Sequence, residues 1–267
     1  MVRVGQRLGK YRLKRRVARG GFGDVYEGYD TIEGITVALK LPLGGVVKEE
    51  NLDDFRREVR ITAKLDHPNI LPIKNADFID KVFVIVQPLG EQSLDDRMSK
   101  RMSLAKRLDY IDQMLAGLAH AHEHGIIHCD IKPDNMILFP DGRLRLADFG
   151  IAKFARKTIQ ASASGSVGYM APEQAMGKPS ARSDVFSAGL VIHQLLTGKL
   201  PQWPFAWPTE GWQRLKPHHQ DLREFVRRGM EVEARKRFRD AVAMYGEFKL
   251  VHRRALKHAS DKRSRKG

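Results

Sequence analysis

The stretch IIHCDIKPDNMIL (Ile126–Leu138) decides how this sequence is interpreted. It places the chain's single cysteine, Cys129, between a histidine and an aspartate. A thiol beside an imidazole is one arrangement of a covalent nucleophile, with Asp130 as the orienting carboxylate. The alternative is that Asp130, Lys132 and Asn135 carry the chemistry and that Cys129 is only their neighbour. The rest of the sequence has to decide between these two interpretations.

The composition is that of an ordinary globular protein. The chain has 267 residues, of which 42% are hydrophobic and 30% charged, enough for one large domain or two lobes. One cysteine cannot form an internal disulfide, and the opening MVRVGQRLGKYRLKRRV lacks the apolar core of a secretory signal. No apolar stretch is long enough for a transmembrane segment. These features predict a cytoplasmic protein.

The net charge of +15 is partly concentrated at the end of the chain. The segment EFKLVHRRALKHASDKRSRKG has eight basic and two acidic residues, a balance of 8 − 2 = +6. We expect residues 257–267 to form a basic C-terminal tail. An acidic partner is one candidate ligand for it, although most such runs are solvated ends. The sequence argues against nucleic acid, because no nucleic-acid fold signature accompanies the charge.

Strand patterns dominate the first third of the chain. Residues 11–30 alternate apolar and polar side chains around a glycine-rich turn, while 35–43 and 82–90 are short apolar runs. Between them, residues 51–65 show apolar positions at helical spacing. The pattern predicts a small strand-rich lobe over residues 1–89.

Helical patterns follow Gly90. We expect helices within residues 103–125, 183–198, 219–231 and 239–258, the second of them apolar almost all round and therefore central. The fold class is α+β: a strand-rich lobe, a helical lobe over residues 90–256, and a hinge near residues 87–92.

Polar residues at the ends of these elements indicate a phosphoryl-transfer site. The turn ARGGFGDV (residues 18–25) has glycines that let backbone N–H groups approach phosphate oxygens, although such turns are common. Lys40 lies on an otherwise apolar strand, where a charge is costly unless it is paired or faces an anion. Glu58 flanks the apolar stripe of the predicted helix over residues 51–65, facing inward. Lys40 and Glu58 together suggest an ion pair inside the protein.

The loop HCDIKPDN supplies a carboxylate, a cation and an amide within six residues, and ADFG adds a second carboxylate, Asp148. Asp130 can accept a proton from a hydroxyl nucleophile. Asn135 and Asp148 offer the hard oxygen ligands that Mg²⁺ prefers, and Lys132 can neutralise a transferring phosphoryl group.

These motifs, in this order, resemble the signature of a eukaryotic-like serine/threonine protein kinase domain of bacterial type. The resemblance covers about residues 8–256 and includes the glycine-rich loop, VALK, the helix glutamate, HCDIKPDN, DFG and APE. It implies the two-lobed protein kinase fold. It also implies an ATP-dependent enzyme that transfers the γ-phosphoryl group of Mg·ATP to serine or threonine hydroxyls of proteins, itself included.

On the reaction side, the resemblance implies that Asp130 orients and deprotonates the acceptor hydroxyl and that Lys132 contacts the γ-phosphate. Asn135 and Asp148 would hold Mg²⁺, with Mn²⁺ as a substitute. Ser166 would approach the catalytic aspartate and lysine, as in serine/threonine kinases.

On the nucleotide side, the resemblance implies that Lys40 holds the α- and β-phosphates and pairs with Glu58. Val86 would guard the pocket behind the nucleotide, while the backbone of Gln87 and Leu89 binds the adenine edge. The residues implied around ATP are Ala18, Gly20, Gly21, Phe22, Gly23, Val25, Ala38, Lys40, Val86, Gln87, Leu89, Asn135 and Asp148.

Three further structural roles follow from the resemblance. Asp184 would brace the catalytic loop, Glu173 would pair with Arg237, and His128 would pack under Phe149 as a structural histidine. Adjacent residues in an extended loop usually point apart, which argues against Cys129 as a nucleophile activated by His128.

Two departures from the family pattern stand out. Ala18 replaces the first glycine of the phosphate loop, and Cys129 replaces an arginine that normally meets a phosphate on the activation segment. Our hypothesis is that activity does not depend on that link, although Thr158, Ser162 and Ser164 can still be phosphorylated.

Two alternatives to an active protein kinase remain open. One is a nucleotide-binding pseudokinase or regulatory scaffold, which only Ala18 favours, and another is a small-molecule phosphotransferase, which the complete APE segment disfavours. The histidines of HAHEHG also invite a zinc assignment. We expect His122 on the core stripe and His120 and His124 on different sides of the helix, which disfavours zinc.

Overall fold

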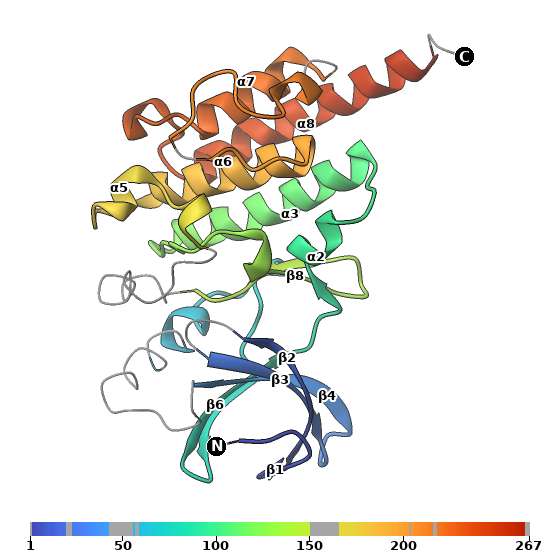
Figure 1. Ribbon diagram of the computed structural model, residues 1–267, viewed down its shortest axis with the longest axis vertical. Coiled ribbons are helices and arrows are strands. Elements are labelled where there is room, and N and C mark those ends of the chain that lie inside the picture. Colours follow the sequence, from blue (N-terminus) through green and yellow to red (C-terminus); the bar gives the residue numbers. More distant parts are fainter. Residues whose placement is uncertain are drawn as a thin grey trace.

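The computed structural model describes residues 2–19, 23–42, 56, 59–149, 166–202, 204–215 and 218–264. Figure 1 shows two lobes, with the N-terminus in the strand-rich lobe and the C-terminus at the end of the helical lobe. This is the predicted α+β division.

The strand-rich lobe is built on one antiparallel sheet with the order β1-β2-β3-β4-β6-β5. The alternating side chains of the sequence become its two faces, because successive residues of a strand point to opposite sides. The strands are β1 (Arg7–Leu8), β2 (Tyr11–Arg19), β3 (Gly23–Asp30), β4 (Ile35–Pro42), β5 (Asn75–Ile79) and β6 (Val82–Pro88).

The two faces of this sheet carry different groups. One face holds an apolar cluster that includes Leu39 and Val86, together with Leu8, Tyr11, Leu13, Tyr26, Val37, Leu41, Val82 and Val84. The other face carries Lys40, which pairs in register with Ile85. Phe83 and Ile85 form a small cluster there with Val59, a residue of the helical segment 59–62. The sheet therefore buries a core on one side and presents Lys40 on the other.

The helical lobe contains the predicted helices and a small sheet. The helices are α2 (Leu94–Met98), α3 (Leu104–Glu123), α5 (Pro172–Ala175), α6 (Ala181–Thr197), α7 (Gln220–Gly229) and α8 (Ala241–Ser264). The sheet comprises β7 (Gln92–Ser93), β8 (Met136–Leu138) and β9 (Leu144–Leu146). Single turns of 3₁₀ helix lie at Pro133–Asn135, Ser166–Tyr169, Trp212–Leu215 and Ala234–Lys236.

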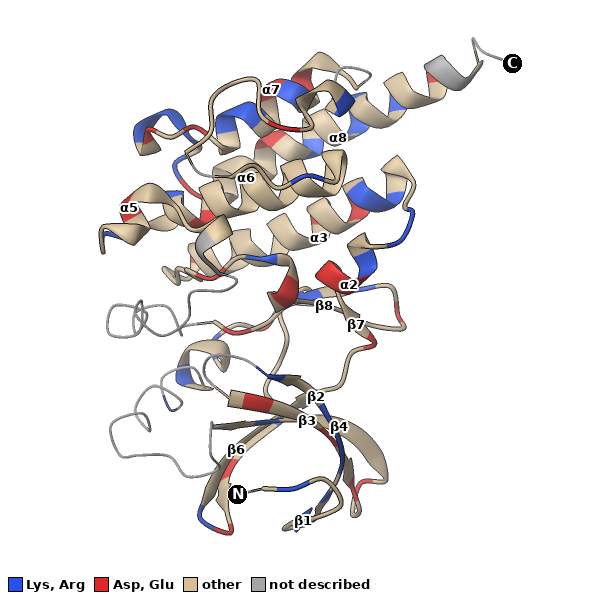
Figure 2. Cartoon of the chain, viewed as in Figure 1, with Lys and Arg blue, Asp and Glu red and all other residues tan. Residues whose placement is uncertain are grey.

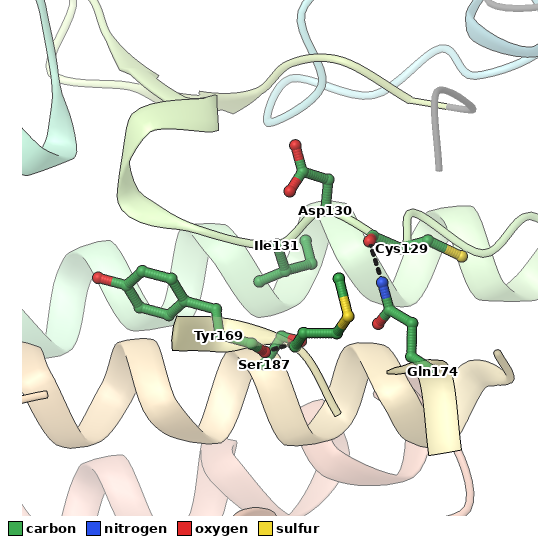
Figure 3. Close-up of a pocket in the computed structure, with 7 residues that line it drawn as sticks. Cys129, Asp130, Ile131, Tyr169, Gln174 and Ser187 are labelled. Carbon is green, nitrogen blue, oxygen red and sulfur yellow. Dashed lines mark hydrogen bonds between the residues drawn. The ribbon is translucent and has the colours of Figure 1, made fainter. Parts of the chain in front are cut away.

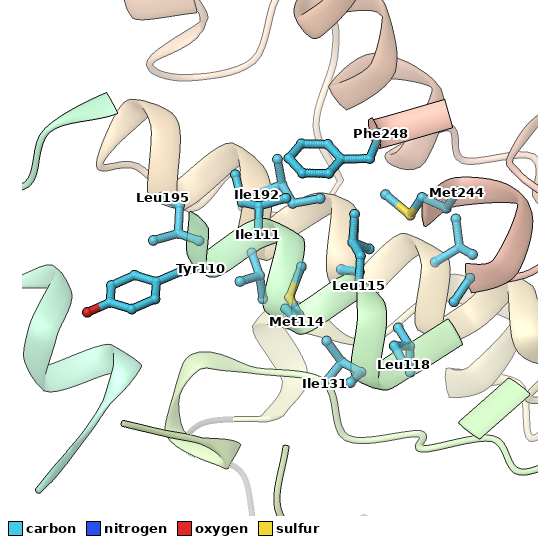
Figure 4. Packing of buried hydrophobic residues seen from close by; sticks show 14 of the residues in the cluster. Tyr110, Ile111, Met114, Leu115, Leu118, Ile131, Ile192, Leu195, Met244 and Phe248 are labelled. Atoms are coloured by element: carbon cyan, nitrogen blue, oxygen red, sulfur yellow. The ribbon is translucent and has the colours of Figure 1, made fainter. Parts of the chain in front are cut away.

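Apolar faces of α3, α6 and α8 meet in the centre of the helical lobe (Figure 4). The apolar stripe of α3 packs against Ile192 of α6 and Phe248 of α8, and both of these side chains are fully buried. A glycine sets the distance between α6 and α7: a Cβ on Gly189 would lie 2.8 Å from the carbonyl carbon of Gly229. As predicted, α6 is the central helix, with nearly every side chain buried.

A segment from the strand-rich part of the sequence is fixed to the helical lobe. Leu65 and Ile70 belong to the helical core cluster. Ile70 forms a parallel bridge with Leu146 of β9, and the Leu146 N–H donates to the Asn69 carbonyl at 2.9 Å. A Cβ on Gly117 of α3 would lie 2.7 Å from that carbonyl oxygen, so the segment rests directly on the α3 backbone.

The end of the chain differs from the predicted separate tail. Helix α8 continues to Ser264, so most of residues 257–267 extend the last helix of the lobe. Figure 2 shows lysines and arginines along this half of α8, and Arg253 and Lys257 are exposed there. Among the helices of the described residues, none combines the length and apolar character needed to cross a bilayer.

Candidate active site between the lobes

Asp130, Lys132 and Asn135 form one cluster in the loop after α3. The Asp130 carboxylate accepts hydrogen bonds from the Asn135 amide at 2.8 Å and from the Lys132 ammonium at 2.9 Å. Asn135 also donates to the Asp130 backbone carbonyl at 2.8 Å. The carboxylate is thus held between a cation and an amide, and Asp130 is half-buried.

Asp148 connects this loop region to the strand-rich lobe. It follows β9 with a left-handed backbone, φ 64°, and accepts a hydrogen bond from Lys40 Nζ at 2.8 Å. Burial acts to raise the pKa of Asp148, but the charge and hydrogen bond of Lys40 outweigh it, so the pKa lies below its ordinary value. Asp148 is therefore an ionised carboxylate at neutral pH.

The donor chemistry of Asn135 and Asp148 fits a magnesium ion. Asn135 uses its amide nitrogen toward Asp130, so its side-chain oxygen is the atom it can offer a cation. Within the described part of the chain, no three carboxylate, imidazole or thiol side chains gather as ligands for one ion. A site of one amide and one carboxylate suits Mg²⁺, which usually completes its shell with water and phosphate oxygens.

Asp184, on helix α6, braces the loop that carries Asp130, as predicted. Its fully buried carboxylate accepts the backbone N–H groups of His128 and Cys129, each at 2.7 Å. It also accepts Nε2–H of His122 at 2.9 Å, while His122 Nδ1 accepts the N–H of Ala241 at the start of α8. The loop is therefore tied to three helices through one carboxylate.

His128 is a structural histidine, which decides the question raised by Cys129. Its Nε2 faces the Ala147 carbonyl at 2.9 Å and its Nδ1 accepts the Asp130 N–H at 3.2 Å. Its ring also packs against Phe149, with 4.5 Å between centroids. Because both ring nitrogens are engaged, His128 has no lone pair left to activate the thiol of Cys129.

The nucleotide side is described only in part. Ala18 pairs with Val25, and Val25 pairs with Lys40, so the three share the face of the sheet that carries Lys40. Ala38 is buried on the same face opposite Gln87. Gly23 opens β3. The residues predicted here that lie outside the described part of the chain are Gly20, Gly21, Phe22 and Glu58.

The register of β6 corrects the predicted position of Val86. Val86 pairs with Leu39 and packs in the apolar cluster on the face opposite Lys40. Ile85, fully buried, pairs with Lys40 itself, so its side chain lies on the face that carries Lys40. Successive side chains of a strand point to opposite faces of the sheet. A register assignment that is wrong by one residue therefore places a side chain on the wrong face.

Glu173 and Arg237 form the predicted ion pair. The guanidinium donates to both carboxylate oxygens, at 2.7 and 3.1 Å, and its side chain is 0% exposed. Glu173 also accepts the Ser183 hydroxyl at 2.7 Å. These bonds join α5 to α6 and to the loop before α8.

The histidines of α3 lie differently from our prediction. His120 and His124 are four residues apart and therefore share one face of the helix, with ring centroids 4.3 Å apart. His67 also stacks on His120, with 5.0 Å between ring centroids. The prediction that His120 and His124 lie on different sides was wrong.

Beside Asp130 lies a small cavity lined by Cys129, Asp130, Ile131, Tyr169, Met170, Gln174 and Ser187 (Figure 3). Gln174 donates from Nε2 to the Cys129 carbonyl at 2.7 Å. Sequence reasoning missed this residue, because a polar side chain after APE has no pattern that distinguishes it. Thr158, Ser162, Ser164 and the side chain of Ser166 lie outside the described residues.

Comparison with known proteins places this geometry in a family. A family model described as "Protein kinase domain" matches residues 11–248. The chain is 35% identical over 213 residues to the serine/threonine-protein kinase PknA of Mycobacterium tuberculosis, covering 74% of this chain and 49% of PknA. It is 34% identical over 207 residues to the serine/threonine-protein kinase PrkC of Bacillus subtilis, covering 74% of this chain and 32% of PrkC.

A solved structure shows the same fold. The kinase domain of Mycobacterium tuberculosis PknI superposes with a TM-score of 0.73 at 23% identity, covering 94% of this chain and all of that one. The chain spans only about a third to a half of the length of the curated relatives named above.

Proposed function

Because this chain belongs to the protein kinase family, we propose that it is an ATP-dependent serine/threonine protein kinase. It transfers the γ-phosphoryl group of Mg·ATP to serine or threonine hydroxyls of proteins, including its own. The observation that carries the proposal is the Lys40–Asp148 contact, 2.8 Å across the lobes, beside the Asp130–Lys132–Asn135 cluster. Serine/threonine kinases at 34–35% identity support the same activity.

We assign the roles on the nucleotide side as follows. Lys40 binds the α- and β-phosphates, Ala38 and Val25 pack against the base, and Ile85 lies behind it. The backbone of Gln87 and Leu89 binds the adenine edge. Asn135 and Asp148 hold Mg²⁺, or Mn²⁺ in its place, and the bound ion neutralises charge on the phosphates.

On the reaction side, Asp130 orients the acceptor hydroxyl and accepts its proton. Lys132, 2.9 Å from the same carboxylate, neutralises charge on the transferring group. Asn135 restrains the carboxylate so that one oxygen faces the acceptor. Turnover on a good substrate is expected in the ordinary kinase range of about 1–100 per second.

Transfer of radiolabelled γ-phosphate from Mg·ATP to the chain itself and to a generic basic protein tests the proposal. Asp130→Asn is expected to lower the rate about 10²–10⁴-fold, because the catalytic base is lost. Asp141→Asn, in an exposed turn, is the matched control and should retain the native rate. Failure of the native chain to transfer phosphate, or equal transfer by Asp130→Asn, would refute the proposal. A nucleotide-binding pseudokinase, which Ala18 favours, would bind Mg·ATP but show no transfer in this assay.

We also propose that activity does not require a phosphate on the activation segment, because Cys129 cannot pair with one. The triple variant with alanine at Thr158, Ser162 and Ser164 should keep most of the native rate. A collapse of its activity would count against this part of the proposal.

Cellular location and partners are part of the same proposal. The single cysteine and the absence of a spanning helix among the described residues support action in the cytoplasm. The basic half of α8 would bind an acidic partner through exposed side chains such as Arg253 and Lys257. Loss of that binding when both are replaced by glutamine, with transfer activity retained, is the expected result.

A further inference from the structure

Cys129 has a backbone conformation that has to be held in place. Its φ is 64°, in the left-handed region that non-glycine residues rarely adopt. It directly precedes Asp130, so its conformation sets the course of the chain into the catalytic residue. Structures keep such strained residues only where the surroundings fix them.

The N-terminal side of Cys129 is fixed by α6. Its N–H donates to Asp184 at 2.7 Å, and the neighbouring His128 N–H donates to the other oxygen of the same carboxylate at 2.7 Å. These two bonds fix the backbone as far as the N–H of Cys129. They do not determine the orientation of the next peptide unit, which joins Cys129 to Asp130.

That peptide unit is held at both of its polar ends. Its carbonyl, on Cys129, accepts a hydrogen bond from Gln174 Nε2 at 2.7 Å (Figure 3). Its N–H, on Asp130, donates to His128 Nδ1 at 3.2 Å. A peptide unit is planar, so fixing its oxygen and its hydrogen fixes the whole plane and the direction in which Asp130 leaves it.

Gln174 itself sits on a rigid support. It belongs to α5, directly after Glu173, whose carboxylate is bound by Arg237 and Ser183. Among the described residues, Gln174 Oε1 is buried without a hydrogen-bond partner, beside the cavity next to Asp130. The hydrogen bond from Nε2 to the Cys129 carbonyl is therefore the only one that compensates for burying the Gln174 amide, because its oxygen has no partner among the described residues.

We infer that Gln174 is a positioning residue for Asp130: its amide N–H fixes the Cys129–Asp130 peptide plane and so aims the catalytic carboxylate. The inference rests on the proposed function, because it assigns Asp130 the role of base. Only a donor can bind the Cys129 carbonyl, so neither Gln174→Met nor Gln174→Glu can replace the native side chain at neutral pH.

The test uses Gln174→Met and Gln174→Glu, with Met176→Gln as the matched control, since Met176 is 77% exposed at the end of the same helix. In the radiolabel assay, kcat should fall by about 10- to 100-fold in both Gln174 variants, as expected for a misplaced catalytic group. The KM for Mg·ATP should stay near its native value, because Gln174 touches no residue assigned to the nucleotide. The thermal midpoint should fall modestly, because the Cys129 carbonyl loses its donor.

Amide hydrogen exchange supplies a readout that does not depend on activity. In the Gln174 variants the Asp130 N–H should exchange about tenfold faster, while the Cys129 N–H, held by Asp184, stays protected. Unchanged exchange at Asp130, or an unchanged kcat, would overturn the inference. If the native chain transfers no phosphate, the proposed function has failed, and exchange alone decides whether Gln174 holds the peptide plane.

Discussion

The Glu173–Arg237 pair predicts an asymmetric loss of stability. Arg237 makes five hydrogen bonds: two to Glu173 and one each to the backbone carbonyls of Glu231, Arg182 and Val232. Replacing Arg237 by methionine therefore leaves a carboxylate and three carbonyls without their donor. Replacing Glu173 by glutamine removes the charge but keeps the shape and an acceptor oxygen.

The magnitudes follow from burial. Breaking a buried ion pair from one side costs about 3–5 kcal/mol, and the orphaned carbonyls put Arg237→Met at the upper end, about 5 kcal/mol. Glu173→Gln should cost about 2–3 kcal/mol, the difference between a charged and a neutral hydrogen-bonded partner. Since domains are stable by only about 5–15 kcal/mol, Arg237→Met should leave the helical lobe close to unfolding. The double variant should cost less than the sum, because the two groups act as one unit.

Urea unfolding, followed by circular dichroism and by tryptophan fluorescence, measures these losses. The pKa of Glu173 lies below its ordinary value of 4.5, because burial, which raises it, is outweighed by the bonds from Arg237 and Ser183. A lowered folded-state pKa adds stability that is complete above the ordinary value and disappears as pH falls through the folded-state value. The stability gap between the native chain and Glu173→Gln should therefore narrow below about pH 4.5. The reasoning would be refuted if both single variants lost less than about 1 kcal/mol of unfolding free energy, as for a surface ion pair. It would also be refuted if the stability difference between the native chain and Glu173→Gln grew as the pH is lowered.

Three further outcomes are expected. Gly117→Ala should destabilise the chain by about 1–3 kcal/mol in urea, because the added methyl meets the Asn69 carbonyl, whereas Gly246→Ala, in open space on α8, should gain about 0.5–1 kcal/mol. Equal effects of the two alanines would show that packing at α3 is not the cause. Asp184→Asn should cost about 1–3 kcal/mol of unfolding free energy, because an amide N–H₂ then faces a backbone N–H, and native stability in urea would contradict this. Lys40→Met should lower phosphoryl transfer by about 10²–10³-fold with folding intact by circular dichroism, and full activity would exclude Lys40 from the site.

The spacing of apolar residues predicted the helices and strands well, because each of these elements is buried either on one face or on all sides. The alternating β2 and β3, the apolar run of β4 and the apolar α6 were recognisable from residue order alone, since each has to bury a face or its whole surface. Polar residues within one short loop, such as Asp130 and Asn135, were also assigned together, because their separation along the chain is small.

What the sequence pattern missed depends on three-dimensional register. Val86 and Ile85 are both apolar, so composition cannot tell which faces Lys40, and only strand pairing decides it. The stack of His67 on His120 joins residues far apart in the chain. The contact of Gln174 could not be predicted either, because its partner is a backbone carbonyl, and every residue has one whatever its type.

The segment around Leu65 and Ile70 makes the two lobes structurally inseparable. It is surrounded in sequence by the strand-rich lobe but completes the core of the helical one. The chain consequently packs against the helical lobe first at Leu65 and Ile70, then forms β5 and β6 in the strand-rich lobe, and enters the helical lobe again after β6. A fragment cut after residue 89 would expose these apolar side chains and leave a hole in its counterpart. The two lobes of this chain therefore depend on each other for a complete core and should be expressed and engineered together.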